Sequence, residues 1–387
     1  MYPDKHRTRG RYGRAPAKTQ AGVEMSNAAN DVDLVVMIMA GGAGTRFWPM
    51  STEERPKQFL NLFGGRSLIQ QSYDRVAGLV PDERIMVLTN EVLTGLVREQ
   101  LPSLPAENVI GEPMRRDTAA AVALAALLAR RRWGNPVMAV LTADHLIRPV
   151  ELFQRTLLSA ARAAAVKPVI YTFGVQPNYP ATCYGYLERG REVADDDGIG
   201  HYELIRFVEK PDAPTAEEYL SSGRYYWNSG MFIWSIETIT GELERQLPDH
   251  VRHLSRAVEA DGTPQWTRAL AESFEPLEAT SIDFGVMEGA EAVHMLAARF
   301  EWNDVGGWLA LEEFLDSDSD GNAHRGGLEV LDAGGNLVFC EDESETVALI
   351  GVSDLVVVRV GNRTLVATKE RVEEIKALVK SLKGGGR

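Results

Sequence analysis

Cysteine is scarce in this chain and long apolar runs are absent, and both shortages exclude classes of protein. The only cysteines among the 387 residues are Cys183 and Cys340. Their wide separation gives no support for a disulfide framework or a cysteine-based zinc site, and two reduced thiols fit the cytoplasm, where we expect the protein. No apolar run reaches the ~18 residues that a membrane-spanning helix needs, so no membrane association is expected.

Positive charge is also in short supply. The 41 Lys and Arg residues face 55 Asp and Glu residues, which gives a formal net charge of −14 and argues against non-specific nucleic-acid binding. The first 24 residues are an exception, since they are basic and lack the apolar core of a secretory signal. We expect residues 1–33 to form a disordered tail, with Met25 as an alternative start. A basic arm that contacts RNA or anionic lipid is the other interpretation.

The segment after the apolar run Leu34–Met39 carries the clearest functional signal. The run itself is typical of a buried parallel strand. Behind it, three positions without a Cβ let backbone N–H groups approach an anion, namely Gly41, Gly42 and Gly44. Arg46 and Lys57 add fixed positive charge close by. A strand, a glycine loop and two separated cations predict a nucleoside triphosphate site with Arg46 and Lys57 as its catalytic residues.

Two commoner phosphate-binding loops do not fit this segment. A P-loop requires Lys-Ser/Thr after its glycines, and the dinucleotide fingerprint requires a third Gly where Phe47 stands. What remains is Gly-Gly-x-Gly-Thr-Arg, a short gap and Pro-Lys, which resembles the signature of sugar-nucleotide pyrophosphorylases. The details Phe-Trp-Pro and Pro-Lys-Gln-Phe-Leu resemble the mannose-1-phosphate guanylyltransferases among them. The alternative is an ordinary strand–helix turn with a chance Arg and Lys.

The resemblance implies a magnesium-dependent enzyme that joins GTP and α-D-mannose 1-phosphate into GDP-mannose and pyrophosphate. Two alternatives stay open: a pyrophosphorylase for another hexose 1-phosphate or nucleotide, and a catalytically inactive homologue that senses nucleotide sugars. A homodimer is possible, with no residue to assign to its interface. Because a sugar phosphate oxygen is already an anionic nucleophile, no general base is needed, and we expect His145 to serve local structure.

The resemblance also implies site residues. Those expected to bind the nucleotide are Ala40, Gly41, Gly42, Gly44, Thr45, Glu112, Asp117 and Thr118. Those expected to bind the sugar phosphate are Gly185, Glu209, Lys210 and Asn228, with Asp283 or Glu288 near the hexose. Asp144 and Asp304 are the implied magnesium ligands, since magnesium takes a few protein oxygens besides phosphate and water. Asp117 replaces the family's usual Asn; it can accept from guanine N–H groups or simply cap the following helix.

The chain alternates strand-like and helical patterns in its first half. Apolar runs predict strands over 85–88, 137–142 and 169–173, and an Ala/Leu-rich stretch predicts a helix over 118–131. This alternation predicts an α/β, doubly wound, mixed and mostly parallel sheet over 34–315, and the resemblance implies that it is of the Rossmann-like nucleotidyltransferase kind. The acidic segment Asp316–Asn322 is expected to be a solvated linker, with a partial calcium loop as the alternative. Five short strands and a helix over 369–383 predict a small β-rich domain over 325–387.

Overall fold

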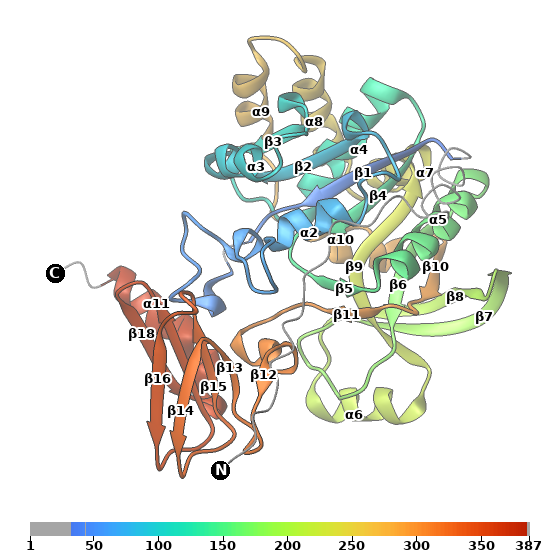
Figure 1. Ribbon diagram of the computed structural model, residues 1–387. Helices are drawn as coiled ribbons and strands as arrows, with labels where there is room; N and C mark the ends of the chain where they lie inside the picture. Colours follow the sequence, from blue (N-terminus) through green and yellow to red (C-terminus); the bar gives the residue numbers. More distant parts are fainter. Residues whose placement is uncertain (1–31, 43, 385–387) are drawn as a thin grey trace.

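The chain folds into a larger α/β unit and a smaller β unit, drawn at the red end of the colour scale in Figure 1. The computed structural model describes residues 32–42 and 44–384. The expected disordered tail over 1–33 therefore lies outside the described residues, apart from its last two positions. Within the described ranges, no helix is long and apolar enough to cross a membrane.

The larger unit contains one nine-stranded sheet. In spatial order its strands are β3 (Val109–Glu112), β2 (Ile85–Asn90), β1 (Leu34–Met39), β4 (Val137–Thr142), β9 (Tyr225–Ser235), β6 (Ile170–Val175), β10 (Val293–Ala297), β8 (Ile199–Val208) and β7 (Tyr186–Asp196). β1 pairs in parallel with β2 and β4, and β6 with β10. β9 runs antiparallel between β4 and β6, and β7 and β8 form an antiparallel ribbon at one edge. The predicted mixed, mostly parallel sheet is confirmed.

Helices cover both faces of this sheet because its central strands are apolar on both sides. One face packs against α2 (Leu68–Asp74), α3 (Thr94–Gln100) and α5 (Val150–Val166). The other packs against α4 (Asp117–Trp133), α7 (Ile236–Gln246), α8 (Pro248–Glu259), α9 (Trp266–Phe274) and α10 (Ile282–Gly285). Along β1, Val36 and Ile38 face the first layer while Val35 and Met37 face the second, as the period of a strand requires. The predicted doubly wound arrangement is thereby confirmed.

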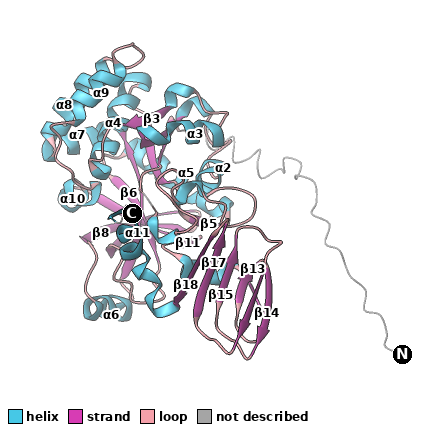
Figure 2. Ribbon diagram, turned by 90° about the vertical axis from the view of Figure 1, so that its left-hand side faces the viewer, coloured by secondary structure: helices cyan, strands magenta, loops and turns pink. Residues whose placement is uncertain are grey.

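The smaller unit coils its strands into a β-helix-like block, visible beside the larger unit in Figure 2. Its strands are β12 (Asp316–Ser317), β13 (Ala323–Arg325), β14 (Gly327–Leu331), β15 (Leu337–Cys340), β16 (Thr346–Ile350), β17 (Leu355–Val360) and β18 (Arg363–Thr368). β13, β15 and β17 pair in parallel in one sheet, and β14 and β16 pair in parallel in a second. The chain thus passes from one sheet to the other and back. The 3-10 helix η8 (Lys369–Glu374) and α11 (Ile375–Gly384) follow, so the predicted terminal helix is α-helical only in its second part.

Stacked asparagines fix the first coils of this block. Asn336 Nδ2 donates to Asn322 Oδ1 at 2.8 Å, and the backbone of Leu355 donates to Asn336 Oδ1 at 2.9 Å. The Asp318 carboxylate accepts from the backbone N–H groups of Asp320 and Asn322, both at 2.9 Å. Most of the segment 316–322 is exposed, as predicted, but it contributes a strand and a turn to the β block. Asp318 closes this tight turn between β12 and β13, because an Asp side chain readily bonds backbone groups just ahead of it.

The two units share a hydrophobic core. Phe47 and Leu60, from the segment after β1, pack in one buried cluster with Phe339 and Val358 of the β block. Trp308 lies between them, with its ring 5.2 Å from Phe47 and 5.0 Å from Phe339. It belongs to the 3-10 helix η7 (Trp308–Phe314), and its Nε1 donates to the carbonyl of Trp48 at 3.0 Å. The β block is therefore built into the support of the glycine loop.

Candidate functional site

The glycine loop begins where β1 ends, and the structure explains Gly44 differently from Gly41 and Gly42. Gly44 has φ 54° and packs on Lys57, where an added Cβ would lie 2.3 Å from the Cβ of Lys57. The Ser51 hydroxyl donates to the Gly44 carbonyl at 2.7 Å and fixes the bend. A Cβ on Gly41 or Gly42 would meet nothing within 4 Å. These two glycines therefore border open space, as a loop that receives a ligand requires.

Lys57 connects two of the predicted site residues. It begins the 3-10 helix η2 (Lys57–Phe59), and its side chain is only 9% exposed. Its Nζ donates to Asp144 Oδ2 at 2.9 Å and to the carbonyl oxygen of Asp304 at 2.5 Å. Burial by itself would raise the pKa of Asp144, but the charge of Lys57 and its hydrogen bond lower it below the usual value. Asp144 is thus ionised at neutral pH.

Arg46 approaches the same region from the 3-10 helix η1 (Thr45–Phe47). One terminal nitrogen donates to the carbonyl of Gly306 at 3.2 Å. Its Nε lies 3.1 Å from a carboxylate oxygen of Glu373, a residue of η8 in the β block. Sequence reasoning missed Glu373, because nothing in the motif points to a carboxylate more than 300 positions away.

A cavity of about 720 Å³ opens beside the loop; we call it the loop-side cavity. Among its lining residues are six predicted ones: Gly41, Gly42, Glu112, Asp117, Thr118 and Asp144. Ala40 lies outside it and is fully buried, with its carbonyl oxygen accepting from Gln58 and Thr89 at 2.8 and 2.9 Å. Ala40 therefore anchors the loop and does not line the space, and its two partners were not predicted.

Glu112 and Asp117 both line this cavity, and the charge of Asp117 acts on the Glu112 carboxyl. Burial first, and then the negative charge of Asp117, raises the pKa of the Glu112 carboxyl to about 7. Asp117 has φ 62°, and its Oδ1 accepts from the adjacent N–H of Thr118 at 2.8 Å. The N-cap position of α4 is Arg116, which makes no side-chain cap bond, so the carboxylate that accepts a backbone N–H at the start of this helix is that of Asp117. The left-handed backbone of Asp117 also places this carboxylate at the wall of the cavity, so the helix-cap and the ligand-binding interpretations do not exclude each other.

A second cavity, of about 260 Å³, continues from the first and is called the central cavity. Both are lined by Met39, Thr118 and Thr142, so they adjoin each other. The central cavity is lined by all the residues predicted to hold a sugar phosphate, Gly185, Glu209, Lys210 and Asn228, and also by Asp304. Most of the predicted binding residues thus line one cavity or the other and Thr118 lines both, whereas Arg46 and Lys57 line neither.

Asn228 is held in one orientation within the central cavity. Its Oδ1 accepts from the Thr172 hydroxyl and from the backbone of Gly230, each at 3.2 Å. Its Nδ2 donates to Asp283 Oδ1 at 3.1 Å. Burial, followed by the charge of Glu209, raises the pKa of Asp283 to about 6. Glu209 itself is ion-paired with Lys210, and a Cβ on Gly185 would lie 2.8 Å from a Glu209 oxygen. A side chain at position 185 would therefore have to displace the Glu209 carboxylate.

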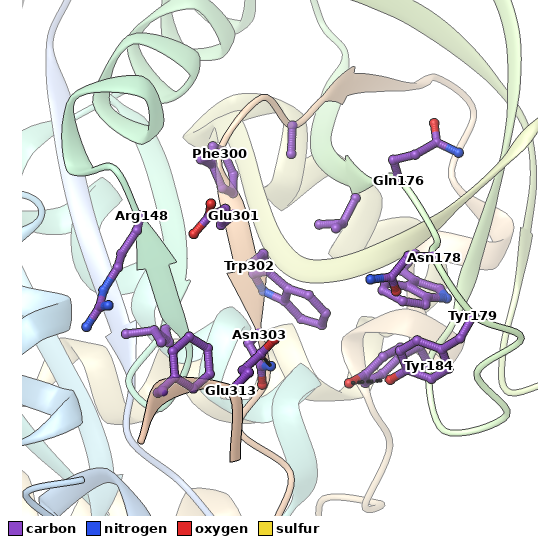
Figure 3. Close-up of a pocket in the computed structure, with 15 residues that line it drawn as sticks. Arg148, Gln176, Asn178, Tyr179, Tyr184, Phe300, Glu301, Trp302, Asn303 and Glu313 are labelled. Carbon is purple, nitrogen blue, oxygen red and sulfur yellow. Dashed lines mark hydrogen bonds between the residues drawn. The ribbon is translucent and has the colours of Figure 1, made fainter. Parts of the chain in front are cut away.

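Two aromatic residues separate the central cavity from a third cavity of about 370 Å³, shown in Figure 3. Tyr184 and Trp302 line both. The Tyr184 hydroxyl donates to Asp304 Oδ1 at 2.7 Å, and Trp302 Nε1 donates to Nδ1 of His145 at 3.0 Å. Burial lowers the pKa of His145 to about 4, so this histidine is neutral and accepts a hydrogen bond. That agrees with a structural role for His145.

Comparison with known proteins decides the family. The nucleotidyl transferase family model matches residues 35–320, and a mannose-phosphate isomerase/GMP-like beta-helix domain matches residues 330–382. The chain belongs to the nucleotidyl transferase family. Mannose-1-phosphate guanylyltransferase of Klebsiella pneumoniae is 40% identical over 353 residues, covering 90% of this chain and 74% of that protein. The XanB xanthan biosynthesis protein of Xanthomonas campestris pv. campestris strain B100 is 37% identical over 358 residues, covering 92% and 74%.

Two solved structures have a similar fold. The structure described as mannose-1-phosphate geranyltransferase from Thermus thermophilus has a TM-score of 0.79 and 34% identity, covering 91% of this chain and 99% of that one. The mannose-6-phosphate isomerase structure from Helicobacter pylori has a TM-score of 0.55 and 27% identity over 70% and 99%. The resemblance to mannose-1-phosphate guanylyltransferases drawn from the loop motif is confirmed.

The donor set of this nucleotidyl transferase fits the magnesium that its family implies. Within residues 32–42 and 44–384, no three His, Cys, Asp or Glu side chains gather as a metal cage. Asp144 and Asp304 both contact Lys57, through a carboxylate oxygen and a backbone carbonyl respectively. Asp144 lines the loop-side cavity and Asp304 the central cavity, and two carboxylates on adjoining cavities suit an ion that takes most of its ligands from phosphate and water.

Proposed function

We propose that this nucleotidyl transferase makes GDP-mannose and pyrophosphate from GTP and α-D-mannose 1-phosphate. An oxygen of the sugar phosphate forms a bond to the α-phosphorus of GTP as the bond from that phosphorus to the β-phosphate bridge breaks. The electron pair leaves with pyrophosphate, and no proton transfer is required. The observation that carries the proposal is the contact of Lys57 with one residue of each adjoining cavity, Asp144 and Asp304.

The loop-side cavity would receive GTP. Its open glycines offer backbone N–H groups to the phosphates, and Arg46 and Lys57 would stabilise negative charge that develops around the α- and β-phosphates. Ionised Glu112 and Asp117 would accept from the N1–H and amino group of guanine. The names of the relatives support guanine as the base, and these two carboxylates are the acceptors it would need.

The central cavity would receive mannose 1-phosphate. Lys210 would exchange its bond to Glu209 for the sugar phosphate, which releases Glu209 to accept a sugar hydroxyl. The fixed Asn228 amide would bond another hydroxyl. Asp144 and Asp304 would hold magnesium, which when bound supplies positive charge to phosphate oxygens. The remaining work is orientation of the two phosphates across the boundary between the cavities.

Pyrophosphate release over a panel of substrates tests the proposal. Four nucleoside triphosphates are each combined with the 1-phosphates of mannose, glucose and galactose, with magnesium or with excess chelator. We expect GTP with mannose 1-phosphate to give the highest kcat/KM and chelator to abolish the reaction. A higher kcat/KM with another pair overturns the substrate assignment, and no release from any pair overturns the enzymatic function.

A further inference from the structure

The β block reaches the glycine loop through a charged contact as well as through the shared core. Glu373 lies on η8, next to Val372, whose side chain is buried in the core that the two units share. The Glu373 carboxylate lies 3.1 Å from Arg46 Nε. That nitrogen is shielded from solvent and has no aligned hydrogen bond within the described part of the chain. The Glu373 carboxylate therefore faces Arg46 Nε, a nitrogen that water does not reach.

Gly307 makes room for this contact. An added Cβ there would lie 3.1 Å from a Glu373 oxygen and 3.7 Å from the Cβ of Arg46. The backbone of Gly307 is extended, with φ −178°, so an L residue could adopt its conformation. Gly307 therefore allows Glu373 and Arg46 to approach each other, because a side chain at this position would press on the Glu373 carboxylate.

Only part of the Arg46 guanidinium is used by these contacts. Gly306 takes one terminal nitrogen and Glu373 faces Nε. Nη2, the other terminal nitrogen, donates no hydrogen bond to the residues that the structure describes. A guanidinium held at two nitrogens has lost most of its rotational freedom, and its remaining N–H groups point in a fixed direction.

We propose that Glu373 is a positioning residue for Arg46 and makes the β block a working part of the nucleotide site. This rests on the proposed function, in which Arg46 binds phosphate. Glu373 holds Nε while Nη2 binds the incoming nucleotide. The conformational entropy of the Arg46 side chain is therefore already lost before GTP binds, and GTP binding does not have to order it. The pair is partly exposed, with side chains 36% and 62% accessible, so it orients the guanidinium without competing strongly against a triphosphate.

A double-mutant cycle on kcat/KM for GTP tests this. We expect Glu373→Gln to lower kcat/KM about tenfold, well short of the ~10²–10³ expected for Arg46→Ala, and to cause no further loss in the Arg46→Ala background. Gly307→Ala should reproduce the effect of Glu373→Gln while leaving both charges in place. Glu374→Gln is the matched control, since Glu374 lies on the same helix and pairs with Arg371 at 2.7 Å, away from Arg46.

Three results would overturn the proposal: unchanged activity in Glu373→Gln, increased activity, or an equal loss in both backgrounds together with a lower Tm. Increased activity would mean that Glu373 restrains Arg46, and the equal loss would mean that it supports only the fold. Calorimetric affinity for GTP, measured on the same variants, separates this from the proposed function. Weaker binding in Glu373→Gln that disappears in the Arg46→Ala background supports positioning even if no sugar phosphate is turned over.

Discussion

Tyr184 lies between two cavities, one of which is drawn in Figure 3, and its hydroxyl donates a 2.7 Å hydrogen bond to Asp304 Oδ1 on the side of the other. Burial, and then the negative charge of Asp304, raises the pKa of Tyr184 well above its usual value. The hydroxyl therefore keeps its proton at all physiological pH values. It fixes one carboxylate oxygen of Asp304, which we proposed as a magnesium ligand, so the other oxygen is the one that would bind the ion.

Replacing Tyr184 by Phe is expected to weaken magnesium use and leave the fold intact. The ring would keep its edge contacts with Trp227 and Trp302 at 5.1 and 5.3 Å, and only the bond to Asp304 is lost. Loss of an outer partner of a metal ligand typically costs about 10–100-fold. We expect the magnesium concentration for half-maximal rate to rise by that factor. The control is Tyr219→Phe. Tyr219 lies away from the site, and its ring stacks on that of Tyr225 with the two centroids 3.8 Å apart. Equal magnesium dependence in both variants would contradict the role of Tyr184.

Lys57→Met should destabilise the protein in a pH-dependent way. The folded-state pKa of Asp144 is lowered, so its charge stabilises the fold above its unfolded pKa of about 3.9 and ceases to do so as the pH falls through the lower folded value. Without Lys57, burial raises the pKa of Asp144, and the ionised carboxylate then lowers the free energy of unfolding. We expect a loss of about 1–3 kcal/mol at pH 7, allowing for the solvent that reaches Asp144, and a smaller loss near pH 4.5. Urea unfolding at both pH values measures this, and a loss that does not change with pH would count against it.

GTP affinity is expected to rise with pH around the pKa of Glu112. This carboxyl has a pKa of about 7 and accepts from guanine only when ionised. Between pH 6 and pH 8 its ionised fraction rises roughly tenfold, and the association constant for GTP should follow. Asp117→Asn removes a neighbouring negative charge, so the midpoint should move to lower pH, whereas Glu112→Gln should abolish the dependence. Calorimetric titration at several pH values checks this, and a flat profile in the unmodified chain would contradict it.

Phe339→Ala should lower both the free energy of unfolding and the affinity for GTP. Phe339 is fully buried in the core that joins the β block to the loop segment, with its ring 5.0 Å from Trp308. Truncation of a buried Phe costs about 3–5 kcal/mol. We expect that loss in urea unfolding together with weaker GTP binding, because the loop loses its support. Normal GTP affinity in a destabilised variant would show that the loop does not depend on the β block.

The sequence was most informative where local chemistry determines local structure. The buried strand over 34–39, the helix over 118–131 and the short strands of the β block follow from apolar periodicity and turn residues. The glycine loop and its two cations could be located because their spacing is itself a motif. The antiparallel position of β9 between β4 and β6 depends on long-range pairing, which no local pattern encodes.

Contacts between distant segments explain what sequence reasoning missed. Glu373 meets Arg46, and Tyr184 meets Asp304, only because separate elements fold against one another. Asp favours a helix cap, but the sequence could not show that the left-handed backbone of Asp117 lets its carboxylate both bond the start of α4 and line the loop-side cavity. The acidic segment 316–322 resembled a linker because the bonds that Asp318 makes to backbone groups cannot be deduced from composition.

Product analysis of the reaction of GTP with mannose 1-phosphate tests the central claim most directly. The claim is transfer at the α-phosphorus across the boundary between two adjoining cavities. With magnesium present, phosphorus NMR should show GDP-mannose and pyrophosphate appearing in equal amounts as both substrates are consumed. Formation of GDP and inorganic phosphate, or no consumption of GTP, would contradict the account.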